Sequence, residues 1–489
     1  MSCQLDKLRR CLPQRIRRAL DELPITLDET YERTLLDIDE EKWAFAHRLF
    51  QCVTVASRPL RVEELAEFLA FDFDGEGSAR FEPDWRPDDA RSAVLSTCST
   101  LISIVNVDDA AVVQFSHFSV KEFLTSTRIA RGRLSRYYIP SKPAHMTVAR
   151  GCLSLLLQLD NQVTKSSIKK FPLARYAAKY WIDHAKAENV SSHVEHEMKQ
   201  LFDPDRPHFA AWSWIYNINI SRDERSMISE RADIPYPLVV TPLYYSILCG
   251  FQDVAEWLVT SCFQDVNARN RDNETSLHAA SGEGFLKIAE LLLEKGADIE
   301  GRDIAGWTPL HWASGRGHVD VSRLLLQCGA NIDAKDNGEQ TPLYFASGSG
   351  HLEVAQLLLE SNADPNTWSW YYRRTTMTPL HVALRWEHLG VVQLLLKHGV
   401  DLNAQNSSGD TLLHFAAQRG QLGVVQQLLE LGANVHVRNN HDQTPLVSQS
   451  RWGRGISDIG LLGNEKYEIE ELLLKHGAES KWPGMAGSP

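Results

Sequence analysis

Four histidines, a residue type that ligates metals, recur at one position of a repeated phrase. They are His278, His311, His381 and His414. Imidazole nitrogens are common zinc ligands, and an aligned column of rings would bring several of them together. Two other copies of the phrase carry Tyr244 and Tyr344 at this position, which a metal site would not tolerate. We therefore expect each imidazole to hydrogen-bond neighbouring backbone, and we expect no metal.

Two further patterns imitate ligand sites. The pairs Gly282-x-Gly284, Gly315-x-Gly317 and Gly348-x-Gly350 resemble part of a dinucleotide-binding loop. The third glycine is missing each time and no long strand precedes them, so we interpret them as helix exits and expect no cofactor. His193, His196 and Glu197 share a helical spacing, but no further ligand is near in sequence. A solvated helix face is the simpler interpretation, and no catalytic residue is predicted.

The repeated phrase itself is the strongest feature of the chain. Thr-Pro-Leu-His or a close variant begins at Thr241, Thr275, Thr308, Thr341, Thr378, Thr411 and Thr444, at intervals of 34, 33, 33, 37, 33 and 33 residues. Threonine is a good helix N-cap, proline suits the first helical turn, and glycine suits a helix exit. Each copy predicts two short helices, which are stable only when neighbouring copies stack and bury a shared apolar face.

These phrases make residues 241 to about 480 resemble ankyrin repeats. We expect about seven repeats over residues 236–482, with the last one a degenerate cap, because about twelve residues are inserted before its second helix. Residues 483–489 would form a disordered tail. The resemblance implies that an unidentified protein partner binds the loop tips and the inner helix row.

Trp, Tyr and Arg dominate the binding energy of protein interfaces, so they are our candidates on this surface. At the loop and inner-helix positions they are Trp307, Arg316, Trp386 and Arg419. The enlarged loop of the fourth repeat adds Trp368, Trp370, Tyr371, Tyr372, Arg373 and Arg374. Exposing so many aromatic rings is costly. This loop is either a partner-binding patch or a segment that folds back onto a neighbouring tip or onto the N-terminal half.

The N-terminal half has a different pattern, which predicts a winged helix over residues 41–135. Helices are expected at 41–55, 62–70 and 90–99, and a two-stranded wing at 101–106 and 111–115. A helical segment (1–40) would precede it, and a helical linker domain (136–235) would follow. The winged helix could read DNA through residues 62–70, but Glu63, Glu64 and Glu67 on this helix would repel phosphates.

Three phrases of this half carry a second resemblance. CQLDKLRRCLPQRIRRALDELPITLDETYERTLL, SRPLRVEELAEFLAF and QFSHFSVKEFLTS resemble the stretch that follows the nucleotide-binding core in fungal NACHT–ankyrin proteins, which are NOD-like, STAND-type ATPases. The resemblance implies that this chain corresponds to the C-terminal portion of such a protein. No Gly-Lys pair exists in the chain, so the phosphate-binding P-loop is missing and ATP hydrolysis is not expected.

Composition narrows the possible partners. The formal net charge of −12 argues against a nucleic-acid partner, and no apolar run is long enough to cross a membrane. No C-x-x-C pair occurs among the eight cysteines, which is typical of an intracellular, cytoplasmic protein. The sequence thus predicts a mostly α chain that acts as a non-catalytic scaffold and binds no small molecule. A fragment of a NACHT signalling NTPase and a DNA-binding regulator are the alternatives.

Overall fold

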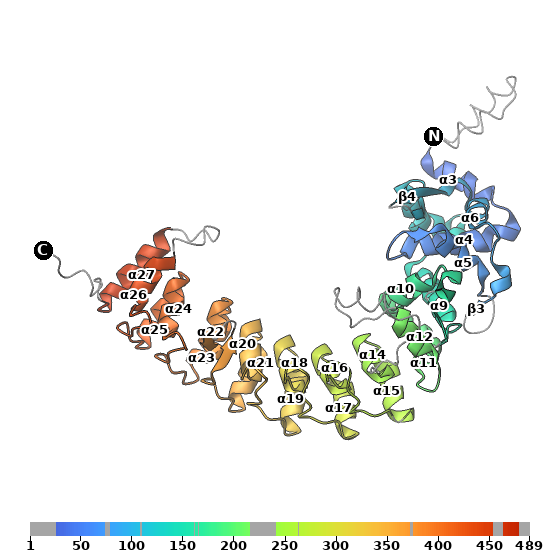
Figure 1. The fold of residues 1–489 in the computed structure, drawn as a ribbon. Helices are drawn as coiled ribbons and strands as arrows, with labels where there is room; N and C mark the ends of the chain where they lie inside the picture. The colour runs from blue at the N-terminus through green and yellow to red at the C-terminus, as the bar shows by residue number, and fades with distance from the viewer. Residues whose placement is uncertain are drawn as a thin grey trace. The chain divides into compact units, whose positions relative to one another are not determined.

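The computed structural model describes residues 26–73, 79–107, 110–160, 162–164, 166–215, 241–262, 264–371, 375–452 and 463–478. The chain divides into two compact units, Met1–Leu238 and Val239–Pro489. Figure 1 shows the elements of each unit. Helices dominate both units, as the sequence predicts, and strands are short.

The first part of the N-terminal unit is built from short helices around a small sheet. Its helices are α3 (Leu27–Leu36), α4 (Trp43–Val55), α5 (Val62–Glu67), α6 (Ala90–Cys98), α7 (Phe118–Thr125) and α8 (Thr127–Arg131). Its strands are β1 (Leu60–Arg61), β2 (Phe71–Asp72), β3 (Arg80–Phe81), β4 (Ile102–Val107) and β5 (Ala110–Phe115). Short 3₁₀ turns occupy Glu40–Lys42, Phe68–Ala70, Pro83–Trp85, Ser99–Leu101 and Ser135–Tyr137.

The predicted helices and the β4–β5 hairpin are confirmed, and the sheet also contains a third strand that the sequence did not predict. Strand β1 joins the hairpin in the order β1-β5-β4, with Leu60 opposite Val113. Two residues are too few for an alternating pattern, so β1 could not be seen in the sequence. Strands β2 and β3, of two residues each, form a second small antiparallel sheet that the sequence did not predict.

The second part of the N-terminal unit is a helical bundle. It contains α9 (Ser141–Leu156), α10 (Ala174–Lys186), α11 (Glu195–Phe202) and α12 (His208–Ile215), with 3₁₀ turns at Ser167–Lys170 and Ala187–His193. Its core is aromatic: the rings of Trp181 and Trp212 meet edge to face with centroids 5.8 Å apart. The Trp212 indole N–H donates to the Ala178 carbonyl (3.0 Å), so this buried ring leaves no unpaired donor.

The C-terminal unit consists of seven helix pairs that follow one another in a row (Figure 1). The first, inner helices are α14 (Pro242–Leu248), α16 (Ser276–Glu283), α18 (Pro309–Arg316), α20 (Pro342–Ser349), α22 (Pro379–Arg385), α24 (Leu412–Gln418) and α26 (Pro445–Trp452). The second, outer helices are α15 (Gln252–Ser261), α17 (Leu286–Glu294), α19 (Val319–Gln327), α21 (Leu352–Glu360), α23 (Leu389–Leu396), α25 (Leu422–Glu430) and α27 (Gly463–Lys475). A hairpin of β6 (Ser369–Tyr371) and β7 (Thr375–Met377) lies between α21 and α22.

Apolar side chains at the predicted positions hold neighbouring pairs together. Leu310, Leu343 and Leu380 are fully buried where successive inner helices pack. Leu292 and Leu325 are also fully buried, and they lie on the outer helices, which pack on one another in the same way. Each buried leucine contributes about 2 kcal/mol of transfer free energy, so the interfaces between pairs account for most of the stability of this unit.

The helix exits confirm the interpretation of the glycine pairs. Gly284, Gly317 and Gly350 cap α16, α18 and α20 in the left-handed region, with φ between +74° and +83°. Replacing Gly317 by alanine should lower the free energy of unfolding by about 2–3 kcal/mol, because its Cβ would also lie only 2.6 Å from His351 Nδ1.

Gly329 is the matched control for this substitution. It has φ +92° and no atom within 4 Å of the position of a Cβ. Gly329→Ala should therefore show only the backbone cost, about 1 kcal/mol. Urea unfolding of both variants measures the difference. Equal losses would show that the His351 contact does not matter.

Candidate protein-binding surface

The histidine column is a set of helix caps, as the sequence predicts. At His311, Nδ1 accepts from the Thr308 N–H (3.1 Å) and from the Thr308 hydroxyl (2.9 Å). Its Nε2–H donates to the Gln340 carbonyl in the next repeat (3.0 Å). His278 and His414 make the same three bonds, to Thr275 and Trp307 and to Thr411 and Gln443 respectively. Each ring therefore joins the start of its own helix to the loop of the next repeat.

His381 departs from this pattern. It bonds the Thr378 hydroxyl (2.8 Å) and the Thr378 N–H (3.4 Å), but its buried Nε2 has no hydrogen-bond partner in the described part of the chain. The rings of Trp368 and Phe415 lie beside it instead, with centroids 5.4 Å and 5.2 Å away. The repeat that follows the enlarged loop thus lacks the hydrogen bond that His311 makes to the next repeat.

Burial keeps these imidazoles neutral. It lowers the pKa of His311 to about 4 and that of His381 to about 3, and it also lowers the pKa of His278 and His414. At His311 the Nδ1 lone pair already faces two donors, so a proton there would break the cap. No cluster of three His, Cys, Asp or Glu side chains suited to a metal occurs among the described residues, His193, His196 and Glu197 included.

Trp307 and Arg316, two of the candidate binding residues, lie in one group of side chains. The Trp307 indole N–H donates to Asp336 (2.9 Å), and its ring meets that of Phe345 with centroids 4.5 Å apart at 63°. Arg316 pairs with Glu283 (2.7 Å), and its guanidinium lies 5.0 Å from the centre of the Trp312 ring. All three aromatic rings are half-buried.

Trp312 and Phe345 were missed by the sequence reasoning. Each lies four residues after its N-cap threonine, and therefore one turn before the exit position that Arg316 occupies. Side chains four residues apart share a helix face, so this spacing could have identified them. The sequence reasoning considered only the loop and exit positions as candidates.

The enlarged loop is tied to the tips on both sides. The Trp370 N–H donates to the Gly338 carbonyl (2.7 Å), and the Gln340 side-chain amide donates to the Trp370 carbonyl (2.9 Å). On the other side, Thr376 and Ser407 exchange two hydrogen bonds of 3.0 and 2.9 Å. The Trp370 ring nevertheless stays 51% exposed, whereas Trp368 is half-buried. The hairpin backbone folds onto its neighbours, and one tryptophan faces outwards.

The remaining candidates lie further along the stack or outside the described residues. Trp386 is the C-cap of α22 and is 55% exposed. Arg419 is the C-cap of α24 and donates to the Arg385 carbonyl (2.8 Å), so it also contributes to the contact between these repeats. Tyr371 lies in β6, but the position of its side chain is not described. Tyr372, Arg373 and Arg374 lie outside the described residues.

In the N-terminal unit, two of the three acidic residues of α5 do not face solvent as the DNA argument assumed. Glu64 is buried and pairs with Arg58 (2.6 Å). Glu67 is buried, pairs with Arg86 and accepts from the Leu173 N–H (2.7 Å). Only Glu63 is exposed. The expected repulsion by Glu64 and Glu67 is therefore wrong, because they fix the inner face of α5 against the rest of the unit.

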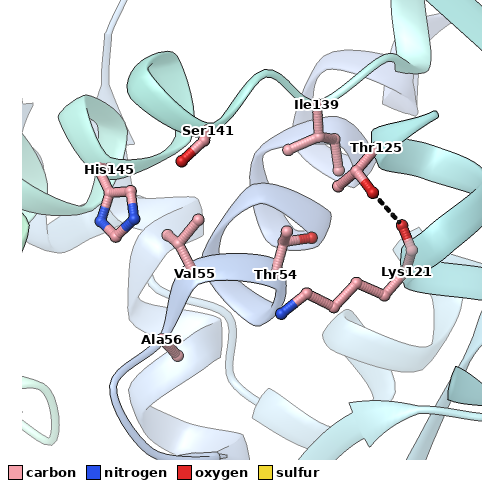
Figure 2. A pocket seen from close by; sticks show the side chains of 8 residues that line it. All are labelled: Thr54, Val55, Ala56, Lys121, Thr125, Ile139, Ser141 and His145. Atoms are coloured by element: carbon pink, nitrogen blue, oxygen red, sulfur yellow. Dashed lines mark hydrogen bonds between the residues drawn. The ribbon is translucent and has the colours of Figure 1, made fainter. Parts of the chain in front are cut away.

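A cavity of about 370 Å³ lies in the N-terminal unit (Figure 2). It is lined by Thr54, Val55, Ala56, Lys121, Thr125, Ile139, Ser141 and His145. The Thr54 hydroxyl donates to the Phe50 carbonyl (2.7 Å) and the Thr125 hydroxyl to the Lys121 carbonyl (2.9 Å). These two hydroxyls therefore bond the backbone of their own helices, and the remaining polar lining residues are Lys121, Ser141 and His145.

Comparison with known sequences agrees with both architectures. Residues 226–303, 300–368 and 371–448 match the family described as ankyrin repeats (3 copies). Residues 24–137 match the family described as GPI inositol-deacylase, winged helix domain. No helix among the described residues has the length and apolar character needed to cross a membrane.

Two curated proteins are similar to this chain. The azaphilone pigments biosynthesis cluster protein L of Monascus ruber is 32% identical over 296 residues, which cover 57% of this chain and 61% of that protein. Alpha-latrocrustotoxin-Lt1a of Latrodectus tredecimguttatus is 34% identical over 61 residues, which cover 12% of this chain and 4% of the toxin. The chain thus spans less than two thirds of the length of either relative.

Solved ankyrin repeat domains are also similar. That of Bcl-3, a member of the IκB protein family, is 31% identical with a TM-score of 0.39, covering 43% of this chain and 93% of the domain. That of human ASB11 is 26% identical with a TM-score of 0.41, covering 50% of this chain and 100% of the domain. The helix pairs and the family matches together identify ankyrin repeats in the C-terminal unit and a winged helix domain of the GPI inositol-deacylase type in the N-terminal unit.

Proposed function

We propose that this chain is a non-catalytic scaffold whose ankyrin repeats bind a partner protein through the inner helix row and loop tips. The observation that carries the proposal is the series of exposed or half-exposed Trp and Arg side chains on three consecutive repeats. Trp307, Arg316, Trp370 and Trp386 belong to this series. Because Trp and Arg dominate interface energies, their alignment on one repeat surface favours recognition of a protein.

The N-terminal unit is then a platform rather than a second protein-binding site. Its α5 helix uses its acidic side chains inside the unit, where Glu67 links the winged helix domain to the turn before α10. The sequence resemblance to NACHT–ankyrin proteins supports a role for this platform in NOD-like signalling, with the domain organisation given by residues 1–40, 41–135, 136–235 and 236–482.

Capture of partner proteins by the tagged full-length chain tests the scaffold proposal. We expect the triple variant W307A/W370A/W386A to lose at least about nine-tenths of the captured partner, since each such truncation costs about 1–2 kcal/mol at an interface. The control is L352A/L389A/L431A, which removes three exposed side chains (43%, 52% and 52%) from α21, from α23 and from the C-cap of α25. Unchanged capture by the tryptophan variant would refute the surface.

A further inference from the structure

The cavity of Figure 2 lies within the N-terminal unit, where α4 and α7 of the winged helix domain meet α9 of the helical bundle. We propose that this cavity binds a small organic acid, whose carboxylate meets Lys121 and His145 and whose apolar body lies against the aliphatic walls. The sequence predicted no small-molecule site, because only folding brings the lining residues of these three helices together.

The size and the lining of the cavity are those of a ligand site. Its volume of about 370 Å³ falls within the range of small-molecule sites, about 300–1,000 Å³. Val55, Ala56 and Ile139 give it aliphatic walls. Ile139 is buried, whereas Lys121 and Ser141 are exposed. An apolar interior with polar groups towards solvent suits a ligand that is itself apolar at one end and charged at the other.

The charged group at the cavity is Lys121. Among the described residues its ammonium belongs to no ion pair, and no Asp or Glu side chain of this part of the chain lines the cavity. Figure 2 shows the Lys121 side chain extending from α7 past Thr54 towards Val55. A single positive charge with no protein carboxylate beside it in the lining favours a ligand that carries one negative charge.

A chain of hydrogen bonds fixes the protons of the second polar group, His145. The Tyr176 hydroxyl accepts from the Ser57 N–H (3.2 Å), so its own proton is free to go to His184 Nε2 (2.9 Å). His184 then carries its ring proton on Nδ1 and donates it to His145 Nδ1 (2.9 Å). This arrangement gives every member of the chain one donor and one acceptor.

The chain leaves His145 with a donor for a ligand. Burial lowers the pKa of His145, on which Glu188 and Lys121 act in opposite directions, and burial lowers the pKa of His184 to about 3. Both rings are therefore mainly neutral at pH 7. A neutral His145 that accepts at Nδ1 holds its proton on Nε2, which has no hydrogen-bond partner in the described part of the chain. This N–H is available to an acceptor in the cavity.

Ser141 adds a third donor, and the set of donors matches a carboxylate. Its hydroxyl makes no hydrogen bond with a described residue, and it begins α9, a helix of 16 residues whose N-terminus adds a partial positive charge. An ionised carboxylate has one negative charge and only acceptors, so it satisfies all three groups. A phosphate monoester carries up to two negative charges at pH 7, and Lys121 alone would balance it.

Titration calorimetry of the full-length chain tests the inference. The probes are hexanoate and 3-phenylpropionate, their neutral primary amides, acetate and inorganic phosphate. At least one of the two acids should bind saturably, about tenfold more tightly than its amide or acetate. Absence of saturable binding by both acids, or equal binding of the amide, would overturn the inference. Equal binding of acetate would overturn the apolar part of the site, and tighter binding of phosphate would overturn its assignment to a carboxylate.

Variants of the lining locate the site. Lys121→Met removes the charge but keeps a long side chain, and Ala56→Leu puts a larger side chain against the cavity. Each should weaken binding of the acid at least about tenfold, whereas Lys121→Arg should keep it within about threefold. Lys142→Met is the matched control, because it removes the same charge next to Ser141 from a side chain that does not line the cavity. Retained binding in Lys121→Met, with circular dichroism showing a folded chain, would overturn the inference.

This inference and the scaffold proposal fail independently. The variant W307A/W370A/W386A should bind the acid as the unmodified chain does, since its substitutions lie in the other unit. Loss of acid binding in that variant would contradict a site confined to the N-terminal unit. If no acid binds while the triple variant loses its partner protein, the cavity proposal is wrong and the scaffold stands.

Discussion

Replacing His311 by alanine should lower the free energy of unfolding by about 4 kcal/mol. The ring is fully buried and joins Thr308 to Gln340 through three hydrogen bonds of 2.9–3.1 Å. Its removal leaves a buried N–H and a carbonyl unpaired, each costing about 1–3 kcal/mol, and it creates a cavity between two repeats. Urea unfolding followed by circular dichroism measures the loss.

His381 provides the matched control. It is equally buried and caps its helix in the same way, but its Nε2 bonds nothing among the described residues. His381→Ala should therefore cost about 1–2 kcal/mol less than His311→Ala, which is the contribution of the link to the next repeat. Equal losses would contradict the view that the Nε2–carbonyl bond couples neighbouring repeats.

Acidification should destabilise the repeats more steeply than carboxylate protonation alone would. Burial lowers the pKa of His311 to about 4 and that of His381 to about 3, while an unfolded chain binds protons at these rings near pH 6.5. Between these values the unfolded state holds the extra protons, so stability falls as the pH falls. In this range each ring lowers the free energy of unfolding by about 1.4 kcal/mol for every unit by which the pH falls. The full stabilising contribution of the neutral ring is present only above about pH 6.5.

Hydrogen exchange of the helices at pH 7 and pH 5 measures this loss repeat by repeat. In His311→Tyr the residue becomes the type found at the equivalent position 344, and one titrating group is removed. Between pH 7 and pH 5, the free energy of unfolding should fall by about 2 kcal/mol less in this variant than in the unmodified chain. An unchanged pH dependence would show that His311 is protonated in the folded state, contrary to its burial.

Much of the fold could be predicted from the sequence because the signals are local. Thr308, Pro309 and Gly317 define a helix start and end within ten residues, and similar patterns recur in the other repeats. The winged helix was also recognised from local patterns, apart from β1, β2 and β3, which have two residues each and are too short to show one. Two repeats carry tyrosine at the position of these histidines. This difference was enough to favour hydrogen-bonded caps over a metal site.

The details of the surface depended on contacts between repeats. Asp336 binds the Trp307 indole across 29 residues, and Phe345 reaches Trp307 across a repeat boundary. No local spacing gives the distance between side chains on different repeats, because stacking sets it. The inward direction of Glu64 and Glu67 was hidden for the same reason, since their partners Arg58, Arg86 and Leu173 come from other elements.

The sequence by itself therefore determined the repeats, their caps and the residue types exposed on them, since each follows from the conformational preference of a short segment. Only the tertiary structure decided which of these residues act together. It joined Trp307 to Trp312 and Phe345, separated them from Trp386, and left His381 without the link that His311 makes. The physical reason is that hydrogen bonds and ring contacts require atoms within a few ångströms, and the packing of one repeat on the next brings those atoms together.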